Sequence, residues 1–204
     1  MEPNTGRLDH RDALELAETT ERNARAAITP SNRFVYATWA IAWPLGFGAR
    51  WVTAGDDPTI DASWAGNLIY SICVLAAVVV TAAHYARRAR GVTGTSSRIG
   101  RNWALAWITA FAACITTTAG IGNVVTSDAA MDLIAACLVT FTIAVIYTAA
   151  GAVIDDRTLY LTGLWLLATC GTAAIVGPYA HLAVIAIGGA IGFTAAAVAT
   201  PEQR

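Results

Sequence analysis

The hydrophobic residues of this chain lie in long blocks that follow a polar stretch at residues 1–33 and are separated by short polar segments. Several blocks reach the roughly 18 to 20 residues that a helix needs to cross the apolar core of a bilayer. The pattern predicts an all-α, polytopic membrane protein: a six-helix transmembrane bundle at residues 34–199, preceded by a short N-terminal cytoplasmic helix and followed by a cytoplasmic tail at residues 200–204. The expected spans are residues 34–54, 64–86, 103–125, 130–153, 158–176 and 179–199.

The polar N-terminal segment is predicted to contain one helix, at about residues 8–28. Within it Glu18 precedes Arg22 by four residues, which is the favourable order for a helical ion pair. Because the segment has few large apolar residues, we expect this helix to be solvated or to contact a cytosolic partner. A helix lying on the membrane surface is the alternative.

Serine and aspartate stand where the predicted helices begin. Their side chains accept hydrogen bonds from the N–H groups of a first helical turn, so they are interpreted as N-caps. The residues at these positions are Ser31, Ser63, Ser127 and Asp156. The adjacent aspartates at 155–156 are also assigned to helix capping, since a metal-binding diphosphate site needs a second acidic cluster.

Composition agrees with a membrane location. Apolar residues make up 56% of the chain and charged residues 13%, whereas about 25% of the residues of a soluble domain are charged. The net charge of -1 excludes a globally basic nucleic-acid-binding protein. The lipid bilayer is therefore the expected partner, and no nucleic acid is.

The arginines are distributed unevenly about the predicted spans. All 13 basic residues are arginine, and with six spans every one except Arg50 falls on the face that carries both termini and the loops at 87–102 and 154–157. Positively charged residues are retained on the cytoplasmic side of a membrane. We therefore expect a multi-pass protein of the cell membrane with its N-terminus and C-terminus in the cytoplasm.

Sequence motifs that would identify an enzyme are absent. The chain has no G-x-S-x-G elbow, no H-E-x-x-H pair and no Walker A lysine motif. Hydrolase, zinc-protease and NTPase functions therefore lack their required parts. We expect no enzymatic activity, no cofactor and no resident metal.

The cysteines lie inside the apolar blocks, in the predicted outer halves of spans two to five: Cys73, Cys114, Cys137 and Cys170. Cysteine in such surroundings behaves as a small apolar side chain, which is the role predicted for all of them. Their shared depth also allows a soft-metal site on these spans.

Aromatic and hydroxyl side chains within the spans form a candidate bundle lining of Trp39, Trp43, Thr117 and Tyr147. Trp39 and Trp43 share one face of the first span, which Pro44 is expected to bend. Such residues either line a pathway or pack between helices, with hydroxyls bonded to backbone carbonyls. The sequence leaves both roles open.

Small residues recur every four positions in the last span, at Gly188, Gly192 and Ala196. A ridge of this kind allows another helix to approach closely. It serves either within the bundle or in a homo-oligomer, and the sequence does not distinguish the two.

Acidic residues gather at the predicted outer ends of the spans. Asp128 and Asp132 begin the fourth span and, with Arg50 and His181, form a candidate outer vestibule. Asp132 lies one turn deeper than Asp128, where an unpaired carboxylate is costly and needs a partner. The structural alternative is that acids simply favour the first turns of these helices.

Two functions are consistent with these features. The first is a small transporter or permease-like component for an uncharged or weakly cationic solute. The second is a non-transporting scaffold or sensor that docks a cytosolic partner through residues 8–28. The central turns of the spans carry no ionisable side chain, which disfavours coupling to protons or sodium, whereas six short-looped helices favour transport.

Overall fold

The computed structural model describes residues 14–16, 19, 32–54, 63–88, 95–178 and 180–201, and within these ranges it is helical and without strands. Its long helices are α2 (Asn32–Ala54), α3 (Trp64–Arg88), α4 (Thr95–Gly122), α5 (Asp128–Ile154), α6 (Arg157–Val176) and α7 (His181–Ala199). The last five are long and apolar enough to cross a membrane. The all-α prediction is thereby confirmed for the described residues, and five of their helices have the length and apolar composition of membrane spans.

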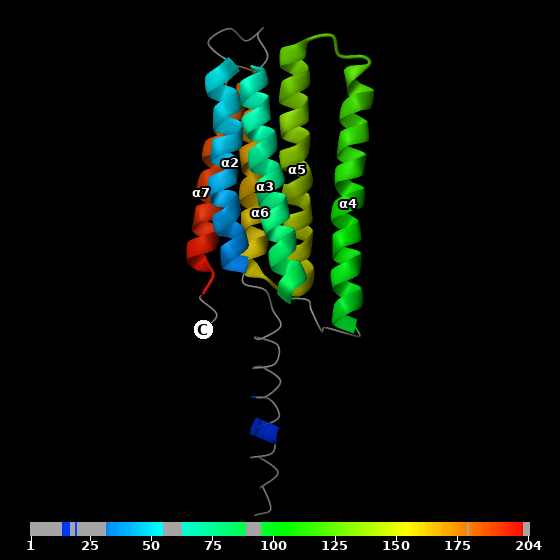
Figure 1. Ribbon diagram of the computed structural model, residues 1–204, viewed down its shortest axis with the longest axis vertical. Helices are drawn as coiled ribbons and strands as arrows, with labels where there is room; N and C mark the ends of the chain where they lie inside the picture. Colours follow the sequence, from blue (N-terminus) through cyan, green and yellow to red (C-terminus); the bar gives the residue numbers. More distant parts are fainter. Residues whose placement is uncertain are drawn as a thin grey trace, which may run out of the picture.

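Consecutive helices run antiparallel, so α2 begins and α7 ends at the same end of the bundle (Figure 1). We call this the lower end, and the opposite end, at which α2 stops and α5 starts, the upper end. The closest packing is between α5 and α6 and between α2 and both α7 and α3, whereas α4 packs mainly against α5. Helices distant in sequence, α2 and α7, therefore lie side by side in the bundle.

The helix bounds differ from the expected spans mainly at α4. This helix begins at Thr95 and ends at Gly122, instead of covering 103–125. A helix can continue from a membrane span into a polar segment because its backbone hydrogen bonds are internal. The predicted N-terminal helix at 8–28 lies mostly outside the described residues.

The caps explain where several helices begin. The Ser127 hydroxyl accepts from Ala130 N–H at 3.3 Å, and an Asp156 carboxylate oxygen accepts from Leu159 N–H at 3.0 Å. Ser63 does the same for Gly66 N–H at 3.2 Å, and Ser31 lies outside the described residues.

Asp155 forms the corner between α5 and α6. It has a left-handed backbone conformation (φ 57°), and its N–H bonds to the Gly151 carbonyl oxygen, which ends α5. The adjacent aspartates at 155–156 thus cap two successive helices, as predicted.

Aromatic side chains fill the middle of the bundle. This aromatic core consists of Tyr36, Trp43, Phe47, Tyr147 and Phe193. The ring centroids of Trp43 and Phe193 lie 5.3 Å apart, and those of Tyr147 and Phe193 lie 6.3 Å apart. Rings at these separations attract each other beyond their burial of apolar surface.

The candidate bundle lining is divided by the fold. Trp43 and Tyr147 pack within the aromatic core, and Trp39 is partly buried against it. The Trp43 indole N–H donates to the Ile185 carbonyl oxygen at 2.9 Å, which ties α2 to α7. Thr117 instead lies exposed on α4, outside the aromatic core, and its assignment to a lining stays a prediction. The α4 face that carries it is not covered by another helix.

Span threonines bond to their own helices. Their hydroxyls donate to the carbonyl four residues earlier, at 2.7–3.0 Å, which removes an unsatisfied donor from the membrane. The threonines that do so include Thr116, Thr140, Thr142, Thr148, Thr169 and Thr172. These hydroxyls therefore satisfy backbone carbonyls.

The small-residue ridge of α7 lies against α6 of the same chain. A Cβ at Gly188 would lie 2.6 Å from the Thr169 hydroxyl oxygen, and one at Gly192 would lie 3.0 Å from Trp165 Nε1. Because the ridge is bare, that indole N–H reaches the Gly188 carbonyl oxygen at 2.7 Å. With Ala196 also buried, the ridge packs within the bundle.

Candidate functional site

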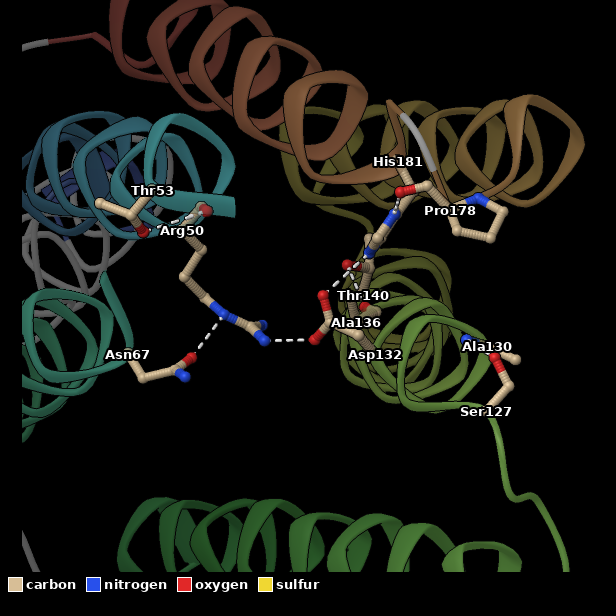
Figure 2. A network of polar contacts seen from close by, with 10 residues as sticks. All are labelled: Arg50, Thr53, Asn67, Ser127, Ala130, Asp132, Ala136, Thr140, Pro178 and His181. Atoms are coloured by element: carbon tan, nitrogen blue, oxygen red, sulfur yellow. Dashed lines mark hydrogen bonds and ion pairs between the residues drawn. The ribbon is translucent and has the colours of Figure 1, made fainter. Parts of the chain in front are cut away.

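Three ionisable side chains from α2, α5 and α7 meet at the upper end of the bundle (Figure 2). Arg50 Nη2 pairs with one carboxylate oxygen of Asp132, and His181 Nε2 lies 3.3 Å from the other. One carboxylate therefore contacts two side chains that are 82 and 49 residues away from it in the sequence. The sequence brought these residues into one candidate site, and the fold places them in contact.

Arg50 is oriented by α3. Its Nε donates to the Asn67 side-chain oxygen at 2.9 Å, and its guanidinium carbon lies 5.3 Å from the centre of the Tyr70 ring. A guanidinium at this distance from an aromatic ring is attracted to its face. We call Arg50, Asn67, Asp132 and His181 the upper polar cluster.

His181 is held from two sides. Its Nδ1 lies 3.1 Å from the Pro178 carbonyl oxygen, in the reversal between α6 and α7, while its Nε2 faces Asp132. The Nε2 contact is an ion-pair distance without hydrogen-bond geometry, so the hydrogen bond of the ring is the one between Nδ1 and Pro178. The ring thus connects the start of α7 to α5.

The three ionisable members of the cluster are largely shielded from solvent, whereas Asn67 is exposed. The side chains of Arg50 and Asp132 are 14% and 13% exposed, and that of His181 is 3% exposed. Charged groups at this depth cost free energy unless they are paired. We expected the Asp132 carboxylate to need a partner at this depth, and in the structure that partner is Arg50, with His181 beside it.

Asp128 does not belong to this cluster. It is exposed in the first turn of α5, where a negative charge is favoured by the helix dipole. The acids of the preceding predicted outer loop, Asp56, Asp57 and Asp61, lie outside the described residues. Asp128 therefore fits the alternative that acids simply favour the first turn of a helix. Of the candidate outer vestibule, Arg50, Asp132 and His181 lie together.

Sequence reasoning missed Asn67 and Tyr70. Asn67 is an amide in the first turn of the otherwise apolar α3, at the end of the helix next to Arg50. A polar residue at the matching depth of a neighbouring span was the signal that would have identified it.

A second polar cluster lies at the lower end. The Asn32 amide donates to Asp156 at 3.4 Å, and the Tyr85 hydroxyl donates to the Asn32 side-chain oxygen at 3.1 Å. We call these three residues the lower polar cluster. The buried Tyr36 hydroxyl has no hydrogen-bond partner among the described residues, and Tyr85 and Asp156 are among its electrostatic neighbours.

The bundle thus has a layered arrangement. Polar side chains tie α2 to other helices at both ends, and the aromatic core separates the two polar clusters. Within the described part of the chain no group of three or more potential metal-ligating side chains comes together.

Comparison of the chain with protein-family models, with curated proteins and with solved structures found no match.

Proposed function

We propose that the chain crosses the cell membrane six times, with α2 as the first span, the upper end outside and both termini in the cytoplasm. The 23 residues of α2 suffice to cross a bilayer core. Its central packing position between α3 and α7 supports the same role. The arginine distribution supports the orientation.

This topology predicts opposite locations for the loops on either side of α3. A reporter that is active only in the cytoplasm should be inactive when fused at residue 58 and active when fused at residue 94. The same compartment for both fusions would contradict the six-span topology.

We further propose that the protein is a small permease-like transporter whose outer end is closed by the upper polar cluster. The observation that carries this proposal is the contact of Arg50 and His181 with the two oxygens of one carboxylate, Asp132. Ionisable residues within spans are rare and mark solute pathways and gates. Exchange of one protein partner of Asp132 for a solute would loosen α2 or α7 from α5.

The solute class follows from the charges at this end. Asp132 is a carboxylate with cationic or hydrogen-bonding partners, so a small cation or an uncharged hydrogen-bonding solute can take the place of one of them. The two carboxylates Asp132 and Asp128 outweigh the single Arg50 guanidinium in charge, so an anion is disfavoured at this end.

Uptake into liposomes tests the proposal, with methylammonium as the cationic probe and glycerol as the uncharged one. Liposomes containing the protein should take up at least one probe faster than protein-free liposomes. Asp132→Asn should lower this uptake about tenfold, equivalent to about 1.4 kcal/mol in the barrier. The physical reason is that a neutral amide at position 132 attracts a cationic or hydrogen-bonding solute less strongly than the carboxylate does.

Asp128→Asn is the matched control, because Asp128 carries the same charge as Asp132, lies one helical turn away from it and is outside the cluster. Its uptake should equal that of the unmodified protein at equal protein content. If neither probe enters faster than in protein-free liposomes, or if both variants behave alike, the transport proposal fails.

The scaffold or sensor function remains the second candidate, and the dense packing of the aromatic core favours it. Under this proposal the bundle moves no solute and residues 8–28 bind a cytosolic protein. Deletion of residues 1–30 should then abolish cellular function while leaving the purified bundle folded. Loss of probe uptake on the same deletion would argue against it.

A further inference from the structure

Two of the cysteines face each other across the interface of α5 and α6. The Cys170 thiol donates to the Cys137 carbonyl oxygen at 3.3 Å, and Cys137 Sγ lies 4.0 Å from the Cys170 carbonyl oxygen. Each thiol is therefore directed at the partner residue on the opposite helix.

Glycine contacts hold this interface at close range. A Cβ at Gly151 would lie 2.6 Å from Tyr160 Cα, and one at Gly163 would lie 2.8 Å from the Ala144 carbonyl oxygen. The backbones of α5 and α6 thus touch at these glycines. The cysteine pair lies on the same interface, nearer the upper end. Because packed helices do not separate freely, the two cysteines are held on facing sides of one interface, each thiol against the other residue, before any ligand binds.

The other two cysteines are placed elsewhere. Cys73 lies on α3, where it faces Gly46 of α2, and Cys114 is buried on α4. The soft-metal site that the shared depth of the cysteines allowed on spans two to five is therefore restricted to one pair. A tetrahedral zinc site needs four ligands, whereas Hg(II), Ag(I) and Cu(I) accept two sulfur ligands in a line.

We propose that Cys137 and Cys170 form a two-thiol binding site for a soft, two-coordinate metal ion, with Hg(II) as its best-fitting member. Binding forms two metal–sulfur bonds and breaks two S–H bonds. Both protons are released to the solvent and no electron is transferred. With Hg(II) the product is neutral, whereas two thiolates around Ag(I) or Cu(I) leave one negative charge among apolar side chains, which is costly.

This proposal does not depend on transport. It is tested by adding HgCl2 to the purified, reduced protein in detergent, removing weakly held ion with excess glutathione and measuring mercury by elemental analysis. The unmodified protein should retain about one mercury per chain, and Cys137→Ser and Cys170→Ser should each retain at least tenfold less. Cys73→Ser and Cys114→Ser are the matched controls and should retain as much as the unmodified protein.

A measurement that keeps both Cys137 and Cys170 avoids any effect of their substitution on folding. In the Cys114→Ser protein, trypsin cleavage at Arg157 separates the peptide 102–157, in which Cys137 is then the one cysteine, from the peptide 158–204, which carries Cys170. Mass spectrometry without reductant should then find these peptides joined by one mercury atom with the loss of two hydrogens. Unlinked peptides, mercury held by a single cysteine, or equal loss of mercury in all four serine variants would overturn the proposal.

Discussion

Asp132→Ala is expected to lower the free energy of unfolding by about 3 to 5 kcal/mol, the range found when one partner of a buried ion pair is removed. The loss is large because the alanine leaves the Arg50 guanidinium and His181 without their shared carboxylate. Thermal or denaturant unfolding of the purified protein in detergent measures it. Asp128→Ala is the control and should change stability by no more than about 0.5 kcal/mol, since Asp128 is exposed and outside the cluster.

A double substitution separates the value of the ion pair from the cost of leaving one charge alone. Arg50→Met combined with Asp132→Leu removes both charges and keeps apolar volume. It should be less destabilising than Asp132→Ala by about 1 kcal/mol or more, because no arginine is left unpaired. An Asp132→Ala variant as stable as the unmodified protein would show that the pair does not hold α2 against α5.

Gly163→Ala is expected to lower the free energy of unfolding by about 3 kcal/mol, the upper end of the range typical for overpacked sites. The added methyl group would lie 2.5 Å from Thr148 N and 2.8 Å from the Ala144 carbonyl oxygen. Both are backbone atoms of α5, so relief requires the two helices to move apart. Unfolding in detergent again provides the measurement.

Gly171→Ala is the matched control on the same helix. No atom lies within 4 Å of its added Cβ, and alanine favours a helix over glycine by up to about 1 kcal/mol. This variant should be as stable as the unmodified protein or slightly more stable. Equal effects of the two substitutions would mean that α5 and α6 do not touch at Gly163.

The candidate site shows how far reasoning from the sequence extends. Asp132 was identified because a carboxylate inside a span needs a partner, and that requirement is a property of the residue and its depth. Arg50 and His181 were grouped with it because the predicted spans place all three near the outer face. That Arg50 and His181 take opposite oxygens of one carboxylate, and that Asn67 orients Arg50, depended on how the helices rotate about their axes.

The sequence by itself determined the all-α class, the long apolar helices that could cross a membrane and most helix starts, because hydrophobic length and capping are local properties of the chain. Tertiary structure alone decided which helices are neighbours. It placed the Gly188–Gly192 ridge against α6, buried Trp43 and Tyr147 while leaving Thr117 exposed, and selected one cysteine pair out of four cysteines. The physical reason is that an apolar helix satisfies its backbone hydrogen bonds internally, whichever helices surround it. Which helices become neighbours therefore depends on close packing between surfaces that are distant in sequence.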